Sequence, residues 1–198
     1  MIKEKTGMYL AYFFQFMIFI SIFFVFFNGN YFYTAGAAIA LFITFLPAII
    51  RRRWNITLPW TLNFLIALSL YFYSWGLAFN FYGSYYPFYD KFGHFFGSIV
   101  VALLGFASVI IVSKHSKLKL TKNQMIFFII IFTMAIGAFW EILEFSFDQI
   151  FGTRANADLS DAMYDMIFNF IGSLVIAVIT NINFETMKEN IVKVEKKN

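Results

Sequence analysis

The pattern of hydrophobic positions divides the chain into six long apolar segments with short polar connectors. The segments cover roughly residues 8–27, 33–50, 60–80, 89–112, 124–147 and 161–181. A helix needs about 20 apolar residues to cross a hydrocarbon layer of ~30 Å. Unpaired backbone groups are costly in lipid, and the sequence has no alternating strands of the transmembrane-barrel type. We therefore predict an all-α fold, a polytopic membrane helix bundle with about six transmembrane helices.

Composition supports this prediction and limits the number of domains. The 198 residues are 61% hydrophobic and only 13% charged, whereas a soluble chain is about half apolar and a quarter charged. We expect one membrane domain over residues 1–198, with a three-helix scaffold half (1–80), a polar three-helix half (85–181) and a basic cytoplasmic tail (182–198). The chain has no cysteine, which excludes disulfides, thiolate metal sites and cysteine nucleophiles.

The loop charges predict the orientation. All of the 15 Lys and Arg residues except Lys91 and Arg154 fall on one side of the six segments, so the positive-inside rule places both termini in the cytoplasm. The distribution of the net charge of +4 therefore argues against nucleic acid as a partner, and the lipid bilayer is the expected one. Frequent Phe, Ile, Asn and Lys indicate an AT-rich bacterial genome, so we expect a multi-pass plasma-membrane protein. For the tail we expect a solvated, frayed end, with binding to anionic lipid as the alternative.

Acidic residues show the opposite bias and gather near the outer ends of the last three segments. Seven of them lie there: Asp90, Glu141, Glu144, Asp148, Asp158, Asp161 and Asp165. At 3.6 residues per turn they form three one-sided stripes, each on one predicted helix. The stripes are Asp90 with His94; Glu141 with Glu144 and Asp148; and Asp161 with Asp165 and Asn169. Since ionised groups facing lipid are costly, we expect the stripes to converge on one outward-facing pocket, with Asp148 and Asp158 at its rim.

Three physical interpretations of this cluster remain open. In a structural one, Lys91, Arg154 and a protonated His94 neutralise the acids. In the second, the carboxylates outnumber the cations and therefore hold a proton or a divalent metal such as Mg²⁺, Mn²⁺, Ca²⁺ or Zn²⁺. The metal-ligand candidates are Asp90, His94, Glu141, Glu144, Asp161 and Asp165. In the third, the site binds a cationic or polyhydroxylated substrate, with Lys91, Arg154 and Asn169 as substrate-binding residues.

Three sequence motifs in this half of the chain carry a family resemblance. They are YDKFGHFFGS, WEILEFSFD and DLSDAMYDMIFNFIGS, within roughly residues 85–180. Together they resemble the YjdF-type inner-membrane proteins and, more loosely, the VanZ-like family, which is associated with glycopeptide resistance. Glu144 stands where the VanZ-like pattern has glutamine, and this Glu-x-x-Glu pair is closer to the YjdF type. The resemblance implies a shared site and names no reaction.

From these residues we expect a membrane-embedded enzyme acting at the outer leaflet on a lipid or lipid-linked envelope molecule. Its catalytic candidates are Asp90, His94, Glu141, Glu144 and Asp165, with a divalent metal as the cofactor that the excess of carboxylates indicates. One alternative is a small proton- or cation-coupled transporter, for which acidic residues should continue toward the cytoplasm. Another is a non-catalytic protein that binds a lipid or a partner.

Overall fold

The computed structural model describes residues 2–153 and 158–196, and in these two ranges helices are the only regular elements. The helices long and apolar enough to cross a membrane are Lys5–Phe27, Tyr31–Trp54, Trp60–Ala78, Phe88–His115, Lys122–Phe151 and Leu159–Ile182. The predicted all-α class and the six spans are therefore confirmed. The helices form two compact units, one of Met1–Tyr89 with Glu189–Asn198 and the other of Asp90–Lys188.

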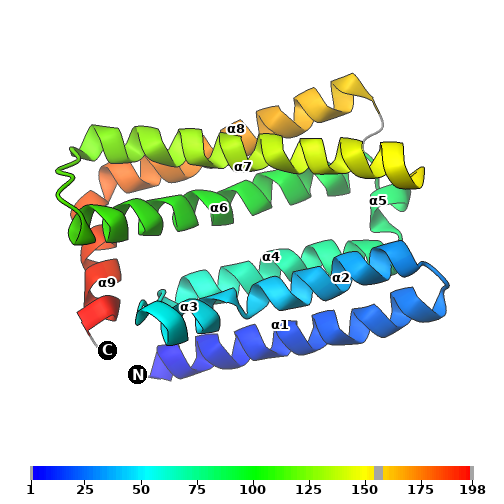
Figure 1. Ribbon diagram of the computed structural model, residues 1–198, viewed down its shortest axis with the longest axis horizontal. Helices are drawn as coiled ribbons and strands as arrows, with labels where there is room; N and C mark the ends of the chain where they lie inside the picture. The colour runs from blue at the N-terminus through cyan, green and yellow to red at the C-terminus, as the bar shows by residue number, and fades with distance from the viewer. Residues whose placement is uncertain (1, 154–157, 197–198) are drawn as a thin grey trace. The chain divides into compact units, whose positions relative to one another are not determined.

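In the first unit, three spans pack side by side (Figure 1). They are α1 (Ile2–Phe27), the pair α2 (Tyr31–Thr44) and α3 (Leu46–Trp54), and α4 (Trp60–Ala78), followed by the one-turn α5 (Phe81–Ser84). Their interiors are neutral, and the hydroxyls of Ser21 and Ser74, both fully buried, lie 2.5 Å apart between α1 and α4. The Trp75 indole nitrogen donates to the carbonyl of Met17 at 3.1 Å. Neutral hydrogen bonds and close packing thus join these helices without any ionised group.

The second predicted span is divided, because the helix is interrupted after Thr44. Phe45 is the shared cap of α2 and α3, and Pro47 occupies the first turn of α3. Proline has no N–H and its ring clashes with the preceding turn of a continuous helix, whereas the first turn of a new helix accepts it. The carbonyl of Thr44 at the interruption accepts a hydrogen bond from the Gln15 side chain at 3.3 Å.

The second unit contains α6 (Phe88–His115), α7 (Lys122–Phe151) and α8 (Leu159–Ile182), shown in green, yellow-green and orange in Figure 1. One glycine lies at each pairwise contact of these helices. A Cβ on Gly105 of α6 would meet Phe132 of α7, and one on Gly137 of α7 would meet Asn169 of α8. A Cβ on Gly172 of α8 would lie 2.7 Å from a carbonyl oxygen of α6. Gly137 and Gly172 therefore let α8 approach its two neighbours closely near the polar stripes, whereas Gly105 lies eleven residues farther along α6 than His94.

The tail is helical and not frayed, which corrects the expectation for residues 182–198. Helix α9 spans Phe184–Lys196. Phe184 is buried against the ring of Phe106, with ring centroids 6.0 Å apart. The ammonium groups of Lys122 and Lys188 lie 5.9 and 5.7 Å from the Phe184 ring centroid. Ring packing on Phe106 and cation–π contacts with two lysines thus hold Phe184, the first residue of α9, against the second unit.

Candidate functional site: an imidazole between carboxylates

Three helices bring their polar stripes together in the second unit. Asp90, Lys91 and His94 come from the first turns of α6, and Glu141 comes from the last third of α7. Asp165 comes from the start of α8, whose N-terminus is capped by the Asp158 side chain accepting from the Asp161 backbone N–H at 3.0 Å. The cap fixes where α8 begins, and so which of its residues face α6.

Lys91 lies at the centre of three aspartates. Its Nζ donates to Asp161 Oδ1 at 2.5 Å, to Asp165 Oδ1 at 2.7 Å and to Asp90 Oδ2 at 3.1 Å. An ammonium group has three N–H donors, so these three carboxylates use all of them. Lys91 is only 8% exposed, so its ammonium group is buried among these carboxylates.

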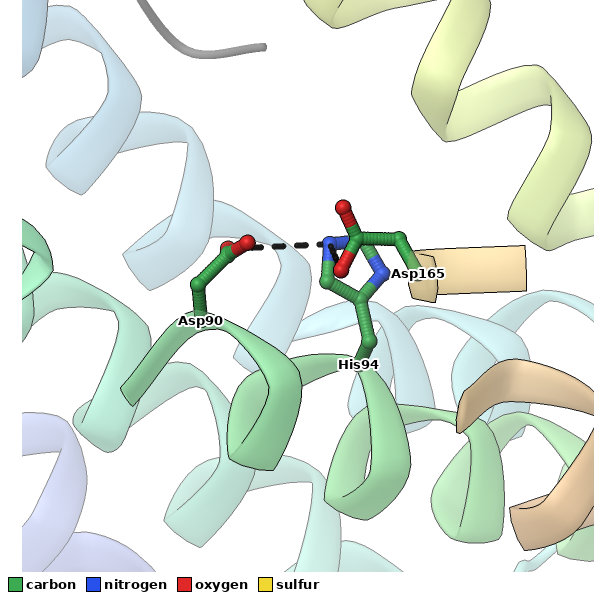
Figure 2. A group of neighbouring side chains, drawn as sticks. All are labelled: Asp90, His94 and Asp165. Atoms are coloured by element: carbon green, nitrogen blue, oxygen red, sulfur yellow. Dashed lines mark ion pairs between the residues drawn. The ribbon is translucent and has the colours of Figure 1, made fainter. Parts of the chain in front are cut away.

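Asp90 connects this lysine to the histidine. One carboxylate oxygen of Asp90 bonds Lys91, and the other, Oδ1, lies 3.7 Å from His94 Nε2. Asp165 Oδ1 approaches the same ring nitrogen from α8, at 3.5 Å (Figure 2). Two carboxylates from two helices thus face one edge of the imidazole.

The opposite edge of the ring faces α7. His94 Nδ1 lies 3.7 Å from Glu141 Oε1, and the His94 side chain is 9% exposed. Separations of 3.5 to 3.7 Å are too long for direct hydrogen bonds, whose N···O distance is about 2.7–3.2 Å. They are suited to groups that share a bridging atom, either a water molecule or an ion.

The donor atoms fit a metal ion by their spacing. Two groups, Asp90 with His94 and Asp165, and His94 with Glu141 and Glu144, each offer donor atoms within 4.8 Å of one another. Two ligands bound at ~2.1 Å in tetrahedral geometry stand ~3.4 Å apart, close to the observed separations. Carboxylate oxygens with one imidazole suit Mn²⁺, Mg²⁺ or Zn²⁺.

Asn169 adds a buried polar group to the same site. It is 4% exposed, and its side chain lies beside the His94 imidazole. Among the described residues, its amide nitrogen Nδ2 has no hydrogen-bond partner. A buried unsatisfied amide is costly, and the cost is relieved when a water or a ligand atom enters the site.

The remaining acids of the stripes lie farther from the ring. Glu144 is half-buried and accepts a hydrogen bond from the Trp140 indole at 2.8 Å. Asp148 accepts from the Thr153 hydroxyl at 2.5 Å. Trp140 and Thr153 were not predicted as partners of these acids. For Trp140, the spacing of four residues to Glu144 on one helix was the available signal. Arg154 lies outside the described residues.

An open groove of about 590 Å³ runs between the ends of α7 and α8 and reaches the cluster at Glu141. Its apolar lining comes from Ile142, Phe145, Leu159 and Ala162, and its polar lining from Glu141, Asp148, Gln149, Thr153 and Asp158. The groove therefore offers both apolar and polar side chains next to the cluster.

Comparison with known proteins identifies the family without naming a reaction. An uncharacterised protein of Thermotoga maritima is 27% identical over 137 residues, which cover 68% of this chain and 69% of that protein. No solved structure matches the chain. Residues 8–186 match the family described as "Predicted membrane protein (DUF2238)". The chain therefore belongs to this family, which is the YjdF-type family that its sequence motifs resemble.

Proposed function

We propose that the protein is a divalent-cation-dependent enzyme that acts at the outer leaflet of the plasma membrane on a lipid or lipid-linked envelope molecule. One observation carries the proposal: carboxylate oxygens of Asp90, Glu141 and Asp165, from three different helices, lie 3.5–3.7 Å from the two nitrogens of His94. Such an arrangement is energetically costly in a membrane unless a bound cation or bound protons compensate the negative charge.

The charge balance favours a cation. Lys91 offsets one negative charge of the three aspartates that it bonds, and Glu141 and Glu144 add two more carboxylates beside His94. Crowded carboxylates must either bind cations or take up protons. A divalent ion compensates two charges at once and uses the carboxylate and imidazole donors already gathered there.

The chemistry that such an ion supplies is activation of water. Held by His94 and the carboxylates beside it, such an ion would make a water molecule a stronger nucleophile. A neighbouring carboxylate would accept the proton of the water that attacks the phosphorus of a phosphoester. The same carboxylate would return a proton to the oxygen of the leaving alcohol as its bond to phosphorus breaks. The site thereby supports hydrolysis of a phosphoester or a similar bond.

The groove supports an amphiphilic substrate. Its apolar side chains Ile142, Phe145 and Leu159 are 60%, 59% and 77% exposed, whereas Glu141 of the same groove belongs to the cluster. A lipid tail lying on the apolar lining would hold its headgroup beside Glu141. Because all three N–H donors of Lys91 are used within the protein, the proposal assigns Lys91 to the organisation of the site, with no role in binding a substrate phosphate.

The residue pattern below the cluster disfavours the transport alternative. On the cytoplasmic side of His94 in α6, α7 and α8, the sequence has no Asp, Glu, Lys, Arg or His until Lys114, Lys122 and Glu185. Proton and cation pathways are typically lined by chains of ionisable residues through the membrane. A one-sided site is better suited to a substrate that arrives from the outer leaflet.

The proposal is tested by metal analysis and by activity. We would purify wild type, Glu141→Gln, Asp165→Asn and, as a matched control, Glu185→Gln, which lies on the exposed surface of α9. Wild type and Glu185→Gln should copurify with a divalent metal and release phosphate from a panel of lipid phosphates in mixed micelles; the two site variants should lose activity. Absence of bound metal, with no loss of stability on chelation, would contradict the proposal.

A further inference from the structure

The imidazole of His94 divides the cluster into two sides of different character. Its Nε2 edge faces Asp90 and Asp165, both of which are already bonded to Lys91. Its Nδ1 edge faces Glu141, next to Glu144. The two edges therefore offer a cation two different environments.

A metal cation on the Nε2 side would compete with the Lys91 ammonium group for the same carboxylate oxygens. The oxygen of Asp165 that lies nearest His94 is the same atom, Oδ1, that accepts from Lys91 at 2.7 Å. A divalent ion bound to this oxygen would lie close to the ammonium group, and the two positive charges would repel each other strongly in this buried place. The Nε2 side thus already holds one cation, the Lys91 ammonium group.

On the Nδ1 side, the carboxylates of Glu141 and Glu144 are not bonded to Lys91, so a bound ion would not share an oxygen with the ammonium group. Glu144 accepts from the neutral Trp140 indole, which orients the carboxylate without adding positive charge. The donor atoms of His94, Glu141 and Glu144 lie within 4.8 Å of one another. Glu141 also lines the groove, so an ion at this position would be accessible to a substrate lying there.

We infer that the cation of the proposed enzyme is held by Nδ1 of His94, Glu141 and Glu144, whereas Lys91, Asp90 and Asp165 position the imidazole. The carboxylates at the Nε2 edge favour the tautomer with its proton on Nε2, which leaves the Nδ1 lone pair directed at the α7 glutamates. This is the arrangement of a metal-bound histidine whose other nitrogen faces a carboxylate. A second indication is the amide Nδ2 of Asn169, which is buried against Gly137, one turn of α7 from Glu141, and has no hydrogen-bond partner among the described residues. The inference rests on the proposed function, of which it specifies the metal ligands.

The test uses Mn²⁺ as the probe and electron spin-echo spectroscopy as the readout. The chain has two histidines, so coordination by His94 gives a nitrogen modulation that His115→Gln retains and His94→Gln loses. Glu141→Gln and Glu144→Gln should abolish Mn²⁺ binding at concentrations that saturate wild type. Asp90→Asn should keep the nitrogen modulation, with an affinity about 10- to 100-fold lower, as is usual for residues that orient a ligand.

Histidine substitutions distinguish metal ligands from positioning residues by a gain of nitrogen modulation. This readout stays informative even if the Glu→Gln variants fold poorly. Glu144→His should add a second nitrogen modulation, because it places a new nitrogen at a ligand position. Asp90→His, the matched control across the ring, should not add one. If Asp90→His adds the nitrogen and Glu144→His does not, the inferred ligand set is overturned while the cation site of the proposed function stands. If wild type binds no Mn²⁺, both are overturned.

Discussion

The Nζ atom of Lys91 on α6 lies 2.5 Å from Oδ1 of Asp161 on α8, although 70 residues separate the two in the chain. Asp161 is 4% exposed and Lys91 8%, so this ion pair is almost entirely removed from solvent. It ties the N-terminal ends of two transmembrane helices together beside the cluster. Its strength depends on keeping both partners, because either charge alone would be buried without compensation.

Removing the cation should therefore destabilise the helix bundle. Lys91→Met leaves Asp90, Asp161 and Asp165 as three buried carboxylates without their ammonium partner, and we expect a loss of about 3–5 kcal/mol of unfolding free energy. The unfolding free energy of wild type and of Lys91→Met is measured by SDS titration in mixed micelles. The double variant Lys91→Met with Asp161→Asn should recover part of the loss, since it removes one of the uncompensated charges. Equal stability of Lys91→Met and wild type would show that the pair does not hold α6 to α8.

The contact of Gly172 with α6 should be intolerant of a side chain. A Cβ there would meet the side chain of Ser98 and lie 2.7 Å from the carbonyl oxygen of Phe95. Backbone cannot rotate away as a flexible side chain can, so Gly172→Val should cost about 1–3 kcal/mol through overpacking. Ile171→Val, next to it on the exposed side of α8, is the control and should change stability little. The same SDS titration compares the two variants.

The two buried hydroxyls of the first unit should contribute unequally. The Ser21 hydroxyl donates to the carbonyl of Ile18 at 2.7 Å, so Ser74 supplies the proton of the Ser21–Ser74 bond. Ser21→Ala removes the acceptor of Ser74, whereas Ser74→Ala leaves the bond to Ile18 intact. We expect Ser21→Ala to be the more destabilising, with a coupling of about 0.6 kcal/mol in a double-mutant cycle, typical of hydrogen bonds between membrane helices. Additive effects of the two substitutions would contradict this.

Divalent cations should stabilise the folded protein through His94. A ligand that binds only the native state at about 100 times its Kd adds ~2.7 kcal/mol to the unfolding free energy. Mn²⁺ should therefore raise the Tm of wild type and of His115→Gln, and a chelator should reverse the effect. His94→Gln should show no increase. A shift of equal size in His94→Gln would place the stabilising ion elsewhere.

The orientation can be measured directly because the chain has no cysteine. Each introduced cysteine is then the only thiol. Ser84 and Ser116 are both exposed, at opposite ends of the intervening span Phe88–His115. The positive-inside rule predicts that a membrane-impermeant maleimide labels Ser84→Cys in intact cells and labels Ser116→Cys only after permeabilisation. The reverse result would place the cluster on the cytoplasmic side.

Several features could be predicted from the sequence because they depend on local periodicity. The length of an apolar run decides whether a helix can span a bilayer, so all six spans were predicted to within a few residues at most ends. The spacing of Asp90 with His94 and of Asp161 with Asp165 decides that each pair shares one helix face. The sequence also shows a proline at position 47, a residue that is unfavourable inside a helix, and a new helix begins there in the structure.

Other features depend on which helix faces carry partners, and only the tertiary structure decided them. The sequence does not show that Lys91 points at α8 and not at headgroups, since that choice depends on the distance between two helices far apart in the chain. It also does not show which nitrogen of His94 faces which carboxylates, or that Phe184 anchors a helical tail. Hydrophobic periodicity thus determined the spans and the stripes, whereas helix packing determined which charges meet, because electrostatic pairing depends on distances that no local pattern encodes.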